Sequence, residues 1–328
     1  MISKADIAPL ITGEAITLAM AASKESRKPI AEGFLYEQTI NMMCADPGVG
    51  KSTISTQVAV ELAAGLPVFG VFKVVRPMKI VYAQTERPLI EWMERVELLS
   101  AVYPIVKENL FVTDEFQKLD MLNPSHVTIV IDCLKRDCPD ADVIFLDPIY
   151  AMISGGLSQD IPASAFTHAM SAIQKATGAT LWYNHHTVRA QLNRDGIEVQ
   201  RHDPSYGSRW LTAHVTGQYQ LVTTKEGTTL HVKKDNYGIL PSTVILHYDH
   251  EIGLCSIPES ELPAVERVRN FIKAQGMMKK PFFFNDICDG TKLCTRTVRK
   301  IVMHSSISEM VKVVSTNRNK HLYQMRGS

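Results

Sequence analysis

The stretch Ala45-Asp-Pro-Gly-Val-Gly-Lys-Ser-Thr53 lies between an apolar run, Ile40–Cys44, and an amphipathic segment, Thr53–Leu62. This order indicates a strand, a tight loop and a helix. The two glycines let successive N–H groups point inward at a helix N-terminus, where they attract an anion. The lysine and the hydroxyl that follow suit phosphate oxygens and Mg²⁺. The stretch therefore predicts a site for a nucleoside triphosphate; the alternative is a glycine-rich turn that only caps a helix.

The residues of this loop also predict the cofactors. Lys51 can reach the β- and γ-phosphates, and the Ser52 hydroxyl can take one coordination position on Mg²⁺. Ala45 stands where the pattern usually has glycine, which is tolerable because alanine is small. The residues expected to contact the nucleotide are Pro47, Gly48, Val49, Gly50, Lys51, Ser52 and Thr53. We therefore expect ATP and Mg²⁺ as cofactors.

The composition indicates a folded chain without a membrane segment. Hydrophobic residues make up 45% of the 328 residues. No apolar run approaches the roughly 18 residues of a membrane span. The first residues carry Asp6 and Glu14, so they make a poor signal peptide. The six cysteines are scattered without a C-x-x-C pair, which is typical of reduced thiols. We therefore expect a cytoplasmic protein that makes no membrane contact.

The chain divides into three predicted parts, an N-terminal arm and linker over 1–30, a domain over 31–258 and a smaller domain over 259–328. In the middle part, short apolar runs alternate with helical stretches, a pattern typical of a parallel sheet covered on both faces. The predicted fold class is thus α/β with a mostly parallel sheet. The expected strands are Ile40–Cys44, Lys79–Ala83, Leu110–Val112, Val143–Leu146, Thr180–Asn184, Tyr219–Thr223, Thr228–Lys233 and Thr243–Tyr248. The expected helices are Thr53–Ala64, Leu89–Val102 and Pro162–Ala176.

The third part is basic. Residues 261–328 contain thirteen Lys or Arg and five Asp or Glu, a formal charge of +8, whereas the remainder of the chain carries −7. The expected elements are a helix over Glu261–Lys273 with Gly276 after it, a strand over Phe282–Phe284, a helix from Thr295, and strands Met310–Val314 and His321–Met325 around a loop, Ser315–Lys320. This order predicts a winged helix-turn-helix; the alternative is a small helical cap for subunit packing. The expected DNA contacts are Arg296, Arg299, Lys300, Arg318 and Lys320.

Two other strands end in acidic residues. Val143-Ile-Phe-Leu-Asp147 is apolar up to its aspartate, and a buried strand needs a partner for such a charge, so we expect Asp147 to hold Mg²⁺ through water. Pro148 follows in place of a second acid, so the general base must lie elsewhere. Lys79-Ile-Val-Tyr-Ala-Gln-Thr-Glu86 ends in a polar turn that we expect beside the phosphate loop. Glu86 is the predicted base that deprotonates the attacking water, unless it is only a surface acid that caps a helix.

A third strand, Thr180-Leu-Trp-Tyr-Asn-His-His186, ends in two histidines. Adjacent side chains on a strand point to opposite faces, so both rarely reach one metal ion. One histidine is therefore predicted to sense the γ-phosphate through a hydrogen bond. His186 is favoured, and His185 is the alternative.

Two polar segments are candidates for contacts outside the subunit. Residues 187–208 are too polar for a core and predict a mobile loop. Its arginines, Arg189, Arg194 and Arg201, suit a nucleic-acid backbone, with an ordinary solvated loop as the alternative. Further on, His231-Val-Lys-Lys-Asp-Asn-Tyr-Gly238 ends a predicted hairpin. It resembles a finger that reaches the phosphates bound by a neighbouring subunit.

Together these motifs resemble RecA-like hexameric ATPases, most closely the RepA-type replicative helicases (AAA_25-like) of plasmids and phages. The resemblance covers about residues 35–248 and rests on the phosphate loop, VYAQTE, FLDP, YNHH, GSRW and KKDNYG in that order. It implies a RecA-like core, a base at Glu86, a sensor histidine and a DNA loop in a central pore. It also implies metal coordination at Ser52 and Asp147. The family's arginine after GSRW is absent, so the finger role falls on Lys234 or Arg209.

The resemblance implies an ATP-driven DNA translocase or replicative helicase that works as a homo-oligomer, a hexameric ring, on single-stranded DNA. Two alternatives remain open. One is a recombination-type ATPase that forms filaments or assists annealing. The other is a DNA-binding initiator or regulator whose assembly is switched by ATP.

Overall fold

The computed structural model describes residues 28–154, 160–186, 191–192, 198–199, 209–224, 227–236, 243–249, 254–257, 264–277, 279–302, 307, 310–317 and 320–326. The predicted N-terminal arm therefore lies almost wholly outside the described residues. Most of the predicted DNA loop, 187–208, lies outside them as well.

A nine-stranded sheet forms the centre of the larger part of the chain, in the order β13-β12-β11-β10-β3-β7-β6-β4-β5. The pairings from β10 to β5 are parallel and those from β10 to β13 are antiparallel. The strands are β3 (Ile40–Ala45), β4 (Ile80–Gln84), β5 (Leu110–Thr113), β6 (Val143–Asp147), β7 (Thr180–His186), β10 (Gly217–Thr224), β11 (Gly227–Asp235), β12 (Thr243–Asp249) and β13 (Leu254–Ser256). The predicted α/β class with a mostly parallel sheet is confirmed.

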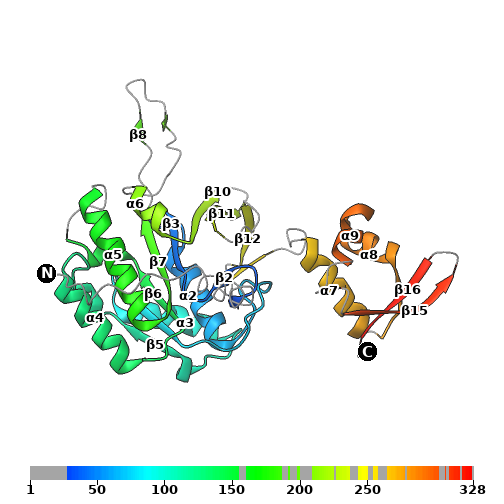
Figure 1. The fold of residues 1–328 in the computed structure, drawn as a ribbon, viewed down its shortest axis with the longest axis horizontal. Helices are drawn as coiled ribbons and strands as arrows, with labels where there is room; N and C mark the ends of the chain where they lie inside the picture. Colours follow the sequence, from blue (N-terminus) through cyan, green and yellow to red (C-terminus); the bar gives the residue numbers. More distant parts are fainter. Residues whose placement is uncertain are drawn as a thin grey trace, which may run out of the picture.

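Helices cover both faces of this sheet (Figure 1). They are α2 (Lys51–Ala64), α3 (Leu89–Ser100), α4 (Pro124–Asp137), α5 (Asp160–Thr177) and α6 (Arg209–His214), with short 3-10 helices η2 (Lys107–Asn109), η3 (Glu115–Lys118) and η4 (Ile149–Met152). Neighbouring strand residues belong to different cores: Met43 packs with α2, and Met42 packs with α4 and α5. Because both faces are buried, the strands are almost continuously apolar.

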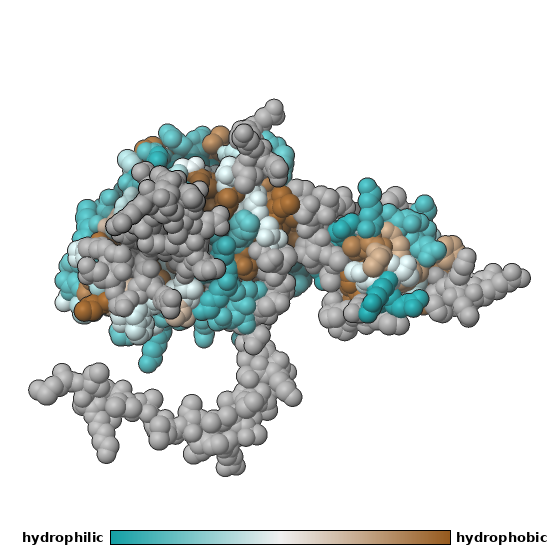
Figure 2. Space-filling view, turned by 90° about the horizontal axis from the view of Figure 1, so that it is seen from above, coloured by the Kyte–Doolittle hydropathy of each residue, from teal (hydrophilic) through white to brown (hydrophobic). Residues whose placement is uncertain are grey.

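Short strands pair outside this sheet. β1 (Pro29–Ala31) pairs antiparallel with β2 (Leu35–Tyr36), and β8 (Gln191–Leu192) pairs antiparallel with β9 (Glu198–Val199). Figure 2 shows hydrophilic residues mixed with small apolar patches over the described surface. Among the described residues, no helix combines the length and the apolar character needed to span a membrane.

The basic C-terminal part has its own small core. Its elements are α7 (Ala264–Met277), β14 (Phe282–Phe283), α8 (Phe284–Thr291), α9 (Thr295–Val302), β15 (Val311–Asn317) and β16 (Lys320–Met325). The strands form a sheet in the order β14-β16-β15. Buried apolar residues from all of these elements pack together, among them Val268, Phe282, Ile287, Val298 and Val311.

Several sequence expectations about this part are wrong in detail. Gly276 lies inside α7 and does not end it, and the close approach of Met325 explains the glycine because a Cβ there would clash with that side chain. Phe284 begins α8 and is not part of a strand. The predicted loop Ser315–Lys320 is mostly strand, since β15 runs to Asn317 and β16 starts at Lys320.

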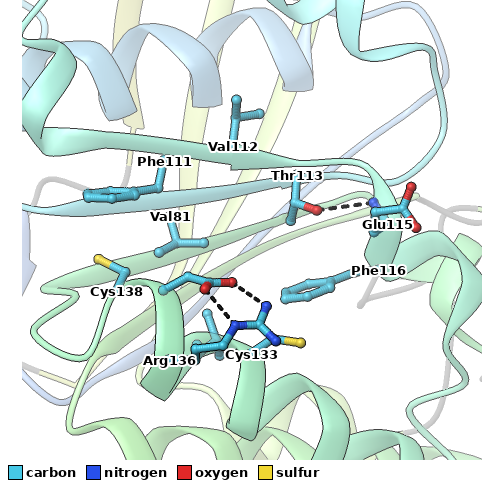
Figure 3. Close-up of a pocket in the computed structure, with 11 residues that line it drawn as sticks. Val81, Phe111, Val112, Thr113, Glu115, Phe116, Cys133, Arg136 and Cys138 are labelled. Carbon is cyan, nitrogen blue, oxygen red and sulfur yellow. Dashed lines mark hydrogen bonds and ion pairs between the residues drawn. The ribbon is translucent and has the colours of Figure 1, made fainter.

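The sheet edge at β5 carries a cavity of about 350 Å³ between β5, η3 and α4 (Figure 3). Its lining is mainly apolar, with Phe111, Phe116 and Leu134 among the residues. Arg136 at this cavity forms an ion pair with Asp137. None of the phosphate-loop residues lines this cavity, so it is separate from the candidate site described next.

Candidate active site

The phosphate loop has the geometry that its glycines require. Gly48 has φ +81° and Gly50, the N-cap residue of α2, has φ +101°. A Cβ at either position would meet no atom within 4 Å. The left-handed backbone, and not crowding, therefore selects glycine. The loop joins β3 directly to the N-terminus of α2, as the sequence predicts.

Lys51 lies folded over the loop and is only 7% exposed. Its Nζ donates hydrogen bonds to the carbonyl oxygens of Ala45 at 2.7 Å and Asp46 at 3.1 Å. The same nitrogen lies 3.3 Å from Nδ1 of His186. Burial lowers the pKa of Lys51, while the charge of Asp147 opposes that shift. Burial and the charge of Lys51 both lower the pKa of His186. A neutral imidazole that accepts at Nδ1 and carries its proton on Nε2 fits this contact.

Asp147 is almost fully buried at the end of β6, and three donors surround its carboxylate. The Ser52 hydroxyl donates to Oδ1 at 3.1 Å, the Asn184 amide donates to Oδ1 at 2.7 Å, and the Tyr82 hydroxyl donates to Oδ2 at 2.5 Å. The predicted pair Ser52 and Asp147 therefore lies together. Hydroxyl and carboxylate oxygens are the ligands that Mg²⁺ prefers, so these residues fit a magnesium ion.

The two side chains beside Asp147 are held by others in turn. Oδ1 of Asn184 accepts from the Ser55 hydroxyl at 2.9 Å and from the Trp182 indole at 3.3 Å, so its amide nitrogen must face Asp147. Burial and the neighbouring Asp147 raise the pKa of Tyr82 well above its usual value, so its hydroxyl keeps the proton that it donates. The sequence analysis assigned no role to Tyr82 or Asn184, although both lie in the quoted strands.

Glu86 follows the end of β4 and is exposed. The expectation that β4 lies beside the phosphate-loop strand is wrong, because β7 and β6 separate it from β3. The Glu86 carboxylate nonetheless acts electrostatically on both Lys51 and His186. It also accepts a hydrogen bond from the Tyr150 hydroxyl. The structure thus brings the predicted base to the same end of the sheet as the loop.

The two histidines occupy different environments. His186 pairs in register with Ala45 and contacts Lys51, whereas His185 pairs with Cys44 and is 2% exposed. The alternation of side chains along a strand explains this difference. His186 is thus the one of the pair that contacts the loop lysine.

The predicted finger residues lie near α6. Lys234, on β11, donates hydrogen bonds to the carbonyl oxygens of Thr212 at 2.9 Å and Ala213 at 3.0 Å, and burial lowers its pKa. These bonds satisfy carbonyl groups at the C-terminal end of α6. Arg209 begins α6, but its side chain lies outside the described part.

The predicted DNA contacts are only partly described. Arg296 and Arg299 are exposed on α9, whose apolar residues Val298 and Ile301 face the small core. Arg189, Arg194, Arg201 and Arg318 lie outside the described residues, and so do the side chains of Lys300 and Lys320.

A phosphate loop on a mostly parallel sheet, with a buried aspartate beside the loop serine, defines the class of P-loop nucleotide-binding proteins. The family model of the AAA domain (AAA_25) matches residues 14–191, more than half of the 328 residues, and the chain belongs to this family of P-loop ATPases. Its members hydrolyse nucleotides. A search of curated proteins finds no match to the chain.

Proposed function

We propose that this protein is an ATP-hydrolysing DNA translocase, a replicative helicase of the RepA type, which works as a ring oligomer. One observation carries the proposal. The polar ends of β3, β4, β6 and β7 bring Lys51, Ser52, Asp147, Glu86 and His186 to one end of the sheet. A loop that only bound nucleotide would not need an acid and a histidine beside the phosphates.

Each residue has a distinct part in the proposed hydrolysis. The loop N–H groups and Lys51 hold the β- and γ-phosphates. Ser52 and Asp147 are the residues that would hold Mg²⁺, which when bound neutralises charge on the phosphate oxygens. Glu86 orients and deprotonates the attacking water. His186 senses the γ-phosphate, because a phosphate that attracts Lys51 competes with the contact of Lys51 to His186.

The second half of the site would come from a neighbouring subunit. Lys234 ends its strand near α6, and Arg209 begins that helix. Either residue could reach the phosphates of the next subunit, which would couple hydrolysis in one subunit to movement of the next. This part of the proposal rests on the resemblance of the KKDNYG segment to a finger.

We also propose that residues 259–328 form a winged helix-turn-helix domain that contacts DNA. The order α7, β14, α8, α9 and the hairpin β15–β16 supports this reading. The exposed Arg296 and Arg299 on α9 supply the charge that a DNA backbone attracts.

The test is an ATPase assay on the full-length chain with and without single-stranded DNA, with Mg²⁺ in all reactions and EDTA as a blank. Wild type, Lys51→Ala and Glu86→Gln are compared. The matched controls are Lys135→Ala and Glu94→Gln, which change exposed residues on α4 and α3. We expect DNA to stimulate turnover several-fold, Lys51→Ala to lose ATP binding, and Glu86→Gln to bind ATP without hydrolysing it.

Other outcomes would select another function. Turnover that DNA does not change, with no displacement of a paired strand, would reject a translocase. ATP-dependent filaments seen by electron microscopy would favour the recombination-type ATPase. Sequence-specific DNA binding that Arg296→Ala abolishes, with slow ATP turnover, would favour an initiator or regulator.

A further inference from the structure

Tyr150 lies between the proposed base and the proposed sensor. It belongs to η4, the short helix that follows β6 and Asp147. Its hydroxyl hydrogen-bonds the Glu86 carboxylate. Its ring lies 4.9 Å from the His186 ring, measured between centroids. One side chain therefore contacts both of the residues on which the proposed chemistry depends.

The backbone around Tyr150 is fixed, whereas its ring is open to solvent. Its neighbours in η4, Ile149 and Met152, are fully buried. Thr85, which directly follows β4, donates its hydroxyl to the Pro148 carbonyl at 2.5 Å and so ties the end of β4 to this segment. The Tyr150 side chain itself is 41% exposed. Burial in the core thus does not account for a large aromatic residue at this position.

The contacts of Tyr150 continue to the phosphate loop. Glu86 touches Tyr150, Tyr150 packs on His186, and His186 lies 3.3 Å from the ammonium group of Lys51. Each of these four side chains comes from a different element. An exposed glutamate samples several rotamers, and a donor on a fixed backbone restricts it to few of them. Restricting the base raises the fraction of bound states in which it faces the water correctly.

We propose that Tyr150 is a positioning residue that holds the Glu86 carboxylate and the His186 imidazole in one arrangement at the phosphate loop. The hydroxyl acts on the base and the ring acts on the histidine. This inference rests on the proposed function and deepens it. Because Tyr150 contacts these two groups and not the loop itself, it affects the hydrolytic step and leaves ATP binding unchanged.

The test separates the two contacts in the full-length chain. Tyr150→Phe removes only the hydroxyl, and Tyr150→Leu removes the ring as well. The control is Tyr183→Phe, because the buried Tyr183 hydroxyl has no hydrogen-bond partner among the residues that the structure describes. For each variant, kcat and KM for ATP are measured with DNA, together with Tm and the affinity for ATP in the absence of turnover.

We expect Tyr150→Phe to lower kcat about tenfold, the effect of one lost hydrogen bond to a charged group, with KM, Tm and ATP affinity unchanged. Tyr150→Leu should lower kcat further, and Tyr183→Phe should behave like wild type. In the Glu86→Gln background, Tyr150→Phe should cause no additional loss, since the base through which it acts is gone.

Three results would overturn the inference. Tyr150→Phe could keep the wild-type kcat while Glu86→Gln abolishes turnover, in which case only the role of Tyr150 fails. It could lower kcat and ATP affinity in parallel with Tm, which would mean a purely structural role. Hydrolysis by Glu86→Gln at the wild-type rate would reject the proposed base itself, and the role of Tyr150 with it.

Discussion

Glu61 is a buried carboxylic acid in α2, and the stability of the fold should report its titration. Its side chain is 0% exposed. It accepts hydrogen bonds from the Gln57 amide at 2.8 Å, the Tyr103 hydroxyl at 2.8 Å and the Phe69 N–H at 3.0 Å. Burial nevertheless raises its pKa to about 7 from the usual 4.5, against the opposing effect of these donors. When Glu61 is protonated, the Tyr103 hydroxyl can rotate and accept its hydrogen bond.

The sign of the pH dependence follows from the raised pKa. Between pH 4.5 and 7 the folded protein holds a proton on Glu61 that the unfolded chain has released, so folding loses free energy as the pH rises through this window. Below this window the full contribution is present, and above it the contribution is gone. A shift of about 2.5 units corresponds to about 3 kcal/mol in total, of which about 2.5 kcal/mol falls between pH 5 and pH 8.

The assay compares urea unfolding of wild type and Glu61→Gln at four pH values from 5 to 8. Tryptophan fluorescence reports on the larger part of the chain, because all three tryptophans, Trp92, Trp182 and Trp210, lie within residues 31–258. Subtracting the two proteins cancels the other titrating groups. Glutamine does not titrate, and its lost contact to the Phe69 N–H adds an offset that does not change with pH.

We expect wild type to lose about 2.5 kcal/mol of unfolding free energy relative to Glu61→Gln between pH 5 and pH 8. Glu94→Gln, an exposed change on α3, should show no such trend. A wild-type to Glu61→Gln difference that stays constant with pH would mean that the three donors keep Glu61 ionised in the folded protein. A difference of the opposite sign would reject the assignment of burial as the dominant effect.

Three further changes test the contacts around α2. Tyr82→Phe removes the 2.5 Å bond to Asp147 and should cost about 2 kcal/mol in urea unfolding, since the carboxylate stays buried with fewer donors. Gln57→Leu removes both hydrogen bonds to the Cys255 backbone, at 2.6 and 2.7 Å, and should cost about 2–4 kcal/mol and raise hydrogen exchange in β13. Gly50→Ala forces alanine to φ +101°, so titration with a fluorescent ATP analogue should show at least tenfold weaker binding. Wild-type behaviour in any of the three would reject the contact concerned.

The parallel strands could be predicted from sequence because both of their faces are buried. Each expected strand from Ile40–Cys44 to Thr243–Tyr248 agrees with the structure to within two residues at either end, since an unbroken apolar run marks its length. The order of the strands could not be predicted this way. It depends on which pairs of strands lie side by side, and β4 is separated from β3 although the sequence analysis expected the two together.

Helix α4 shows why local composition can mislead. Its run Val127-Thr-Ile-Val-Ile131 is typical of a strand, and the sequence analysis placed no helix there. The start of the helix is set by Asn123, whose side chain accepts a hydrogen bond from the Ser125 N–H at 3.0 Å, and by Pro124 at the first helical turn. Val127, Val130 and Leu134 then lie on one face, which packs into the core. The position of these apolar residues at helical spacing outweighs the β-branched composition.

In the active site, the sequence predicted the residues of local motifs and missed those that strand register brings in. Asp147 lies opposite Gln84 on β4, and the neighbouring pair Leu146 and Tyr183 places Asn184 beside it on β7. Tyr82 lies two residues before Gln84, so it projects from the same face of the sheet and its ring reaches the carboxylate.

A shift of one residue in either pairing would turn Tyr82 or Asn184 to the opposite face and leave the buried charge of Asp147 with too few donors. The register of β4, β6 and β7 is therefore a condition of the site, as necessary as the phosphate loop. This is why an apolar strand that ends in aspartate could predict a metal ligand but could not predict what holds it. The same reasoning applies to Tyr150, whose partners on β7 and after β4 flank its own strand and adjoin it only when the sheet has formed.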